Sequence, residues 1–256
     1  MNLNRPLAVS IATLCALCLA CQPHKENSLD SPVIRVGIVT SLTGAEAKFG
    51  QAQRYGYEMA LDEINAQGGV LGKKVELVYQ DDTSKDEVAM TAVDKLTEDP
   101  EIRAIIGAYK SSATFPASAV ANRYRVPMLV PSAITDEITR QGYEWVFRVC
   151  APASAYGRAM VDFLTKAAAV ARLAVVYENT QFGSSVARAA LEQAPRAGIE
   201  IVAFEAYDPG GTDFTPLLTR VKSSGPEAVL FVSYLADATL LIRQAKEIDL
   251  NPKAFT

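Results

Sequence analysis

Strand patterns and helix patterns alternate along this chain from Val33 onward, and this alternation constrains the fold more than any other feature. Short apolar, β-branched runs such as 33–39 (VIRVGIV) and 228–232 (AVLFV) are typical of strands. Apolar residues between them recur at helical spacing, as Tyr57, Ala60, Leu61 and Ile64 do. Further strands are expected at 75–79, 102–108, 126–130, 145–149, 173–177 and 199–204, and further helices at 113–123, 154–169, 184–193, 214–222 and 236–248. The alternation predicts right-handed βαβ units and mainly parallel sheets.

The number of strand patterns predicts two lobes. About ten strands exceed what one small open sheet usually holds. We expect the chain to cross between lobes near 148–152, so that residues 33–149 form the first lobe and residues 150–256 the second. Strands that are apolar throughout fit sheets covered on both faces. The predicted fold class is therefore α/β.

One helix start and one helix face are also predicted. Ser84 and Glu87 have the spacing of a capping box, in which the two side chains satisfy free amides at a helix start. The helix that follows would bury one stripe of residues, formed by Ala89, Ala92, Val93 and Leu96.

The first twenty residues have the composition of a secretory signal. Arg5 precedes an apolar run from Leu7 to Ala20 that is too short to span a bilayer and ends in small residues. A buried helix is the alternative, but the run lacks the alternating polar residues that would give it an outer face. Residues 1–20 are therefore interpreted as a signal peptide, and the polar, proline-bounded residues 21–32 as a tether.

The sequence 19–21 (LAC) resembles the lipobox of bacterial lipoproteins, in which the cysteine is lipidated. Cys18 stands where that motif prefers leucine. A plain signal cleaved near Ala20 is the alternative. The interpretation as a lipoprotein places the protein in the periplasm or at the cell surface, held to the membrane by acyl chains on Cys21.

The folded part lacks the residue sets of several common enzyme classes. His24, in the tether, is the only histidine, so 33–256 can hold no serine–histidine or cysteine–histidine site. Cys150 is interpreted as a structural thiol, and the pair Asp81-Asp82 as a strand end or helix cap rather than a metal site. Neither GxGxxG after a strand nor GxxxxGK[ST] occurs. We expect no enzyme activity, no metal and no cofactor. With 25 basic and 29 acidic residues spread along the chain, no nucleic-acid tract is expected.

A family resemblance then emerges from motifs in register. The chain resembles the leucine/isoleucine/valine-binding proteins at 37–44 (GIVTSLTG), 49–50 (FG), 59–65 (MALDEIN), 68–72 (GGVLG), 81–82 (DD), 111–114 (SSAT), 131–133 (PSA), 181–183 (QFG) and 243–245 (RQA). The resemblance implies a type I periplasmic binding protein with two Rossmann-like lobes that trap an amino acid between them. It also implies a monomer that serves an ABC permease in the membrane. The family's chain runs on beyond the position of Thr256, so the second lobe is expected to be incomplete here.

The resemblance also implies a set of ligand contacts. Ser111 matches a serine that binds the ligand carboxylate together with helix amides, and Ser132 matches a contact made through backbone atoms. Ile134 stands where the family has threonine, so Thr135 is expected to take over or one bond is lost. The other implied contacts are Ser112, Tyr234 near the ammonium group, and Phe49 and Phe182 as aromatic walls.

Each contact also has a simpler interpretation. Ser111 and Ser112 would cap a helix, Tyr234 would be a surface residue between the lobes, and Phe182 would be core. For the whole chain, the alternatives are a ligand-sensing receptor domain, or a binding protein for an amide or an aromatic carboxylate.

Overall fold

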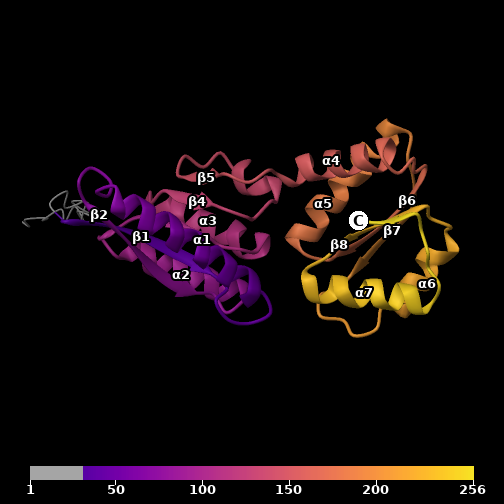
Figure 1. Ribbon diagram of the computed structural model, residues 1–256, viewed down its shortest axis with the longest axis horizontal. Helices are drawn as coiled ribbons and strands as arrows, with labels where there is room; N and C mark the ends of the chain where they lie inside the picture. The colour runs from indigo at the N-terminus through magenta and orange to yellow at the C-terminus, as the bar shows by residue number, and fades with distance from the viewer. Residues whose placement is uncertain (1–30) are drawn as a thin grey trace, which may run out of the picture.

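The computed structural model of the protein describes residues 31–256, which form two α/β lobes side by side (Figure 1). The first lobe contains strands β1 (Val33–Thr40), β2 (Lys74–Asp81), β3 (Ile102–Ile106), β4 (Met128–Val130) and β5 (Val146–Arg148), with helices α1 (Ala47–Ala66), α2 (Asp86–Glu98) and α3 (Ser111–Tyr124) and the 3-10 turn η1 (Asp136–Thr139). The second contains β6 (Arg172–Glu178), β7 (Glu200–Tyr207), β8 (Ala228–Val232) and β9 (Ala254–Phe255), with α4 (Ala153–Lys166), α5 (Gln181–Gln193), η2 (Pro195–Ala197), α6 (Thr215–Ser223) and α7 (Leu235–Glu247).

Both sheets are entirely parallel, so the prediction of an α/β fold with parallel sheets is confirmed. The first sheet has the order β2-β1-β3-β4-β5, and the second has the order β7-β6-β8-β9. The signal peptide, the tether up to Asp30 and the lipobox at Cys21 lie outside the described residues.

The alternation of β6 explains how the second lobe is layered. Leu173 and Val175 point into a core shared with α4 and α5, whereas Ala174 and Val176 point into a core shared with α6 and α7. All four are fully buried. Because successive side chains leave a strand on opposite faces, a strand covered on both faces must be apolar at every position.

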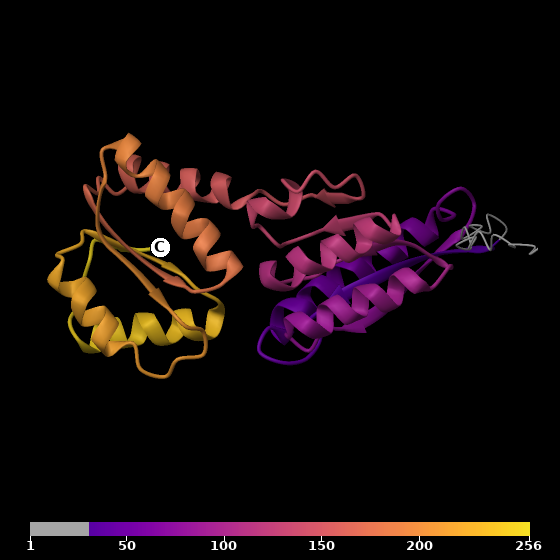
Figure 2. The same cartoon turned by 180° about the vertical axis from the view of Figure 1, so that it is seen from behind.

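In the first lobe, α2 and α3 pack together over one face of the sheet (Figure 2). The predicted stripe of α2 is buried, with Ala89 and Val93 at 0% exposure. Gly37 allows α2 to approach β1, because a Cβ there would lie 2.7 Å from Leu96 Cδ1.

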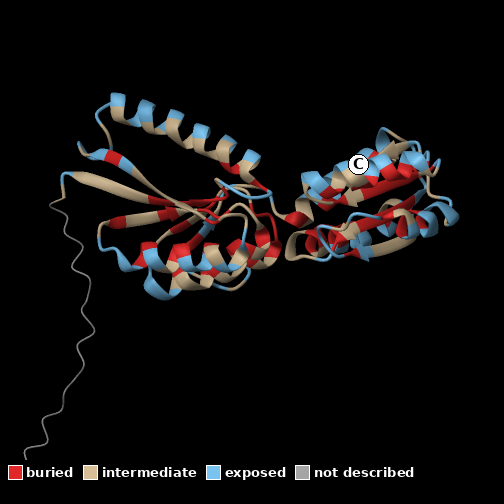
Figure 3. Cartoon of the chain, turned by 90° about the horizontal axis from the view of Figure 1, so that it is seen from below, coloured by how far each residue is buried: buried red, intermediate tan, exposed pale blue. Residues whose placement is uncertain are grey.

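Helix α1 differs from its expected role. Gly50 is its only buried residue, while Met59 and Ile64 are 73% and 38% exposed. Figure 3 shows α1 with exposed residues along much of its length. The predicted stripe is only partly covered, because α1 packs chiefly on β2, whereas α2 and α3 also pack on each other.

The predicted capping box at Ser84 is wrong. Helix α2 begins at Asp86, and Ser84 lies before it in a left-handed conformation with φ 62°. Its hydroxyl donates to the Thr43 carbonyl at 2.9 Å and accepts from the Glu46 amide at 3.0 Å. A contact with a distant loop therefore replaces the local cap.

The pair Asp81-Asp82 completes this junction. Asp81 accepts hydrogen bonds from the amides of Leu42 and Thr43, and Asp82 accepts one from the Ser41 hydroxyl at 2.6 Å. The two carboxylates fix the β1–α1 loop, from which α1 starts.

Candidate functional site

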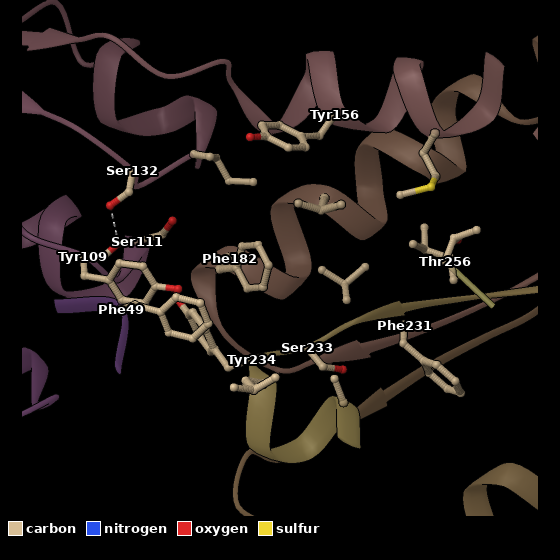
Figure 4. A pocket seen from close by; sticks show the side chains of 17 residues that line it. Phe49, Tyr109, Ser111, Ser132, Tyr156, Phe182, Phe231, Ser233, Tyr234 and Thr256 are labelled. Atoms are coloured by element: carbon tan, nitrogen blue, oxygen red, sulfur yellow. Dashed lines mark hydrogen bonds between the residues drawn. The ribbon is translucent and has the colours of Figure 1, made fainter. Parts of the chain in front are cut away.

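A cavity of about 490 Å³ lies between the lobes (Figure 4). The first lobe supplies residues that follow β3 and β4, including Ser111 and Ser132. The second supplies residues from α4, from α5 and from the end of β8, including Tyr156, Phe182 and Tyr234. The site therefore lies where parallel strands end, which is where open α/β sheets bind ligands.

Four aromatic rings, here called the aromatic ladder, cross from one lobe to the other. Phe49 and Tyr109 of the first lobe stack with centroids 5.2 Å apart. Tyr109 meets Tyr234 of the second lobe at 6.1 Å, and Tyr234 meets Phe182 at 5.0 Å. Each such pair contributes about 0.5–1.5 kcal/mol beyond the area it buries.

Tyr234 is packed inside this ladder. Its amide donates to the Glu178 carboxylate at 3.3 Å. Burial raises the pKa of its hydroxyl, an effect that the neighbouring Ser111 amide opposes. The hydroxyl thus lies against the start of α3 in the opposite lobe.

Ser111 is the first residue of α3 and is 1% exposed. The side chain of Lys110, the residue before this helix, does not cap it, and the Ser111 hydroxyl accepts from the Thr135 amide at 3.4 Å. Because Ser111 lines the cavity, the start of α3 meets it at the positive end of the helix dipole, an arrangement that favours anions.

The Ser132 hydroxyl is occupied within the first lobe. It accepts from the Gln53 amide group at 2.9 Å and donates to the Tyr109 carbonyl at 3.3 Å. Gln53 in turn accepts from the Thr40 hydroxyl at 2.6 Å. This chain of bonds leaves the backbone of Ser132 as the part that can serve a ligand.

Two of the predicted contacts do not line the cavity. Thr135 is fully buried, and its hydroxyl donates to the Gln181 carbonyl of the second lobe at 3.0 Å. Ser112 is also absent from the lining, whereas Ile134 is part of it. Lys110, just before Ser111, pairs with Asp86 at 3.0 Å.

Phe49 and Phe182 both line the cavity. Phe182 also packs against the core of the second lobe, and its role as a wall for a ligand stays a prediction.

Sequence reasoning missed Tyr109 and Tyr156. Tyr109 follows β3 directly, so its place at a strand end was a usable signal. Tyr156 comes from α4 and faces the cavity from the side opposite the ladder (Figure 4). No motif marks a residue on a helix between lobes, so the sequence carried no signal for it.

Within residues 31–256, no three histidine, cysteine, aspartate or glutamate residues are grouped to hold a metal ion. The same residues include no helix with the length and apolar character needed to cross a membrane.

Two parallel-sheet lobes enclosing a cavity at their strand ends define a two-lobed α/β binding protein. A family model described as periplasmic binding protein matches residues 33–256, and the chain belongs to that family. It is 31% identical over 226 residues to a leucine-, isoleucine-, valine-, threonine- and alanine-binding protein of Pseudomonas aeruginosa, covering 88% of this chain and 60% of the relative. It is 32% identical to a Leu/Ile/Val-binding protein homologue of Brucella melitensis, covering 85% and 59%.

Solved structures agree with this assignment. The branched-chain amino acid transporter substrate-binding protein of Streptococcus pneumoniae, in complex with isoleucine, matches with a TM-score of 0.79 and 28% identity over 87% of this chain and 63% of that one. An ABC transporter substrate-binding protein of Desulfitobacterium hafniense, in complex with leucine, matches with a TM-score of 0.72 and 25% identity over 86% and 64%. The chain spans about 60% of the length of the curated relatives named above.

Proposed function

We propose that the full-length protein is the extracytoplasmic solute-binding component of an ABC importer. It captures an amino acid, with the branched-chain type favoured, and delivers it to a membrane permease. One observation carries the proposal: an apolar cavity, lined by Ile134, Phe182 and Leu230, adjoins the start of α3. A branched-chain amino acid joins a carboxylate to an apolar side chain in the same way, and the relatives named for such ligands support the choice.

Capture needs only binding groups. The ligand carboxylate accepts hydrogen bonds from the Ser111 hydroxyl and the first amides of α3, and charge-assisted bonds of this kind are the strong ones. The backbone of Ser132 adds a contact, and Phe49 and Phe182 cover the side chain. Since 33–256 contains no histidine, we expect the solute to leave chemically unchanged.

A second candidate ligand is an aromatic carboxylate. None of the residues that line the cavity, among those described, carries a charged side chain. A ligand with a carboxylate and a flat ring but no ammonium group would fit such a lining beside the aromatic ladder.

Calorimetry on the full-length protein tests both candidates. Titration with leucine, isoleucine and valine is expected to give saturable binding, and benzoate and glutamate serve as comparison ligands. Tighter binding of benzoate than of any amino acid would favour the second candidate. Failure of every carboxylate to bind, or recovery of a chemically altered ligand, would contradict the proposal.

The lipid anchor belongs to the same proposal. Acylation of Cys21 would hold the protein at the membrane surface beside the permease, as a monomer on its tether. Two acyl chains provide stable anchoring where a single chain is marginal.

A further inference from the structure

Carboxylates from both lobes gather beside the aromatic ladder. Glu46 stands at the start of α1 in the first lobe, while Glu178 ends β6 and Asp237 lies in the first turn of α7 in the second. Their exposures are 8%, 2% and 8%. Glu178 and Asp237 both act electrostatically on Glu46 across the boundary between the lobes.

The three carboxylates differ in the hydrogen bonds that they accept. Glu178 accepts the Tyr234 amide at 3.3 Å, and Asp237 accepts the Gly210 amide at 3.0 Å. Oxygen Oε2 of Glu46 is buried and has no hydrogen-bond partner among the described residues. Lys110 attracts Glu46, but its ammonium group is bound to Asp86.

Of the three carboxylates, Glu46 is the one whose electrostatic surroundings change most with the relative position of the lobes. Two of the three charges that act on it, those of Glu178 and Asp237, come from the opposite lobe. Glu178, by contrast, takes most of its partners from its own lobe. Separating the lobes would remove both like charges from Glu46.

We propose that Glu46 takes up a proton when the lobes close, so that closing of the cleft, and with it capture of the solute, is favoured in acid. The inference rests on the proposed function, because it assumes that capture closes the lobes. Closing brings the Glu46 carboxylate against two other carboxylates in a less watery surrounding, which disfavours its negative charge. Uptake of a proton neutralises Glu46 and so removes this penalty.

The direction of the pH effect follows from the closed form. Burial raises the pKa of Glu46, Lys110 opposes the rise, and Glu178 and Asp237 add to it. The closed form then holds more protons than the open form, so closing strengthens as pH falls through the raised pKa. The gain is complete below the ordinary range of a glutamate, about 4.3.

Other titratable groups face this cluster. Burial also raises the pKa of Glu178 and of Asp82, and the Lys110 charge opposes both shifts. Burial raises the pKa of Tyr109 to about 12 and also that of Tyr234, so both hydroxyls stay neutral.

Small-angle scattering of the ligand-free full-length protein from pH 8 to pH 5 tests the linkage without any solute. The radius of gyration is expected to fall as pH falls. Glu46→Gln should remove this response and give a compact form throughout. Glu63→Gln, the same change at an exposed position of α1, should keep it. A pH response in Glu46→Gln equal to that of the wild type would overturn the proposal.

Lys110→Met supplies a second variant with the opposite expectation. It removes the cation that stabilises the charged form of Glu46, so the compaction should begin at higher pH. An unshifted midpoint would contradict the assigned role of Glu46, even if Glu46→Gln failed to fold.

Calorimetry with leucine, in two buffers of different protonation enthalpy, separates this inference from the proposed function. We expect proton uptake on binding, and a dissociation constant that rises by up to about tenfold per pH unit. If leucine binds without proton uptake and with the same affinity at every pH, the proposed link between protonation and closing is overturned, but the proposed function is not. Absence of amino-acid binding, with the scattering response intact, would overturn the choice of solute alone.

Discussion

At the scale of single residues, the site is built around the start of α3. Ser111 and Tyr234 meet there from opposite lobes, although 123 positions separate them in the sequence. The position of Ser111 after a strand made it predictable. The packing of Tyr234 between Tyr109 and Phe182 was not, because it depends on how two lobes approach each other.

Replacing Ser111 by alanine is expected to weaken solute binding by about 1–3 kcal/mol, the cost of leaving a bond to a charged group unmade. Ser112→Ala is the matched control, since Ser112 does not line the cavity. Calorimetry at one pH measures both. Equal dissociation constants for the two variants would show that the carboxylate binds elsewhere.

Tyr234→Phe should lower the stability of the solute-bound protein by about 1 kcal/mol, because it removes a hydroxyl that lies at the Ser111 amide of the opposite lobe when the cleft is closed. Urea unfolding of the full-length protein measures the change. Tyr55→Phe, at a ring that is 64% exposed, should leave the unfolding midpoint unchanged. An equal loss of stability with and without solute would contradict this expectation, because it would mean that the two lobes also meet at Tyr234 in the ligand-free protein.

At the scale of elements, the sequence predicted the periodic buried face of a helix but missed a contact between a helix start and a distant loop. The α2 stripe is buried as its spacing indicated, because one helix face meets one sheet face. Ser84 failed as a cap, because a loop from β1, 41 residues earlier along the chain, competes for its hydroxyl. Periodicity records which face a helix buries, but it does not record which distant loop completes its start.

Two glycines of α1 should respond in opposite ways to alanine. A Cβ at Gly50 would lie 1.9 Å from the Ser41 carbonyl oxygen, which is backbone, so α1 and Phe49 would have to shift. We expect Gly50→Ala to destabilise the fold and weaken binding. A Cβ at Gly56 meets nothing within 4 Å, so Gly56→Ala should stabilise by about 0.5–1 kcal/mol. Thermal unfolding compares the pair, and equal shifts would contradict the close approach.

At the scale of the whole molecule, the two-lobed architecture could be inferred from the count of strands and their parallel pattern. The way the lobes meet could not. The bond from Thr135 to the Gln181 carbonyl, and the carboxyl of Asp136, which accepts from the Ser154 amide at 2.9 Å, join positions that no periodicity relates. The cavity depends on that junction, since residues of both lobes line it.

The proposed position of the whole molecule in the cell rests on Cys21. If acyl chains on Cys21 hold the mature protein, Cys21→Ala should move it from the membrane fraction to the soluble extracytoplasmic fraction. The reason is quantitative: each buried methylene contributes about 0.8 kcal/mol, so two long chains bind far more tightly than a polar tether could. Cys150→Ala is the control, because that cysteine is half-buried beside the Ala133 carbonyl in the folded part. Detergent phase partitioning and metabolic labelling with a fatty acid measure the outcome. Unchanged partitioning of Cys21→Ala, with no label on the wild type, would leave a cleaved signal near Ala20 as the correct interpretation.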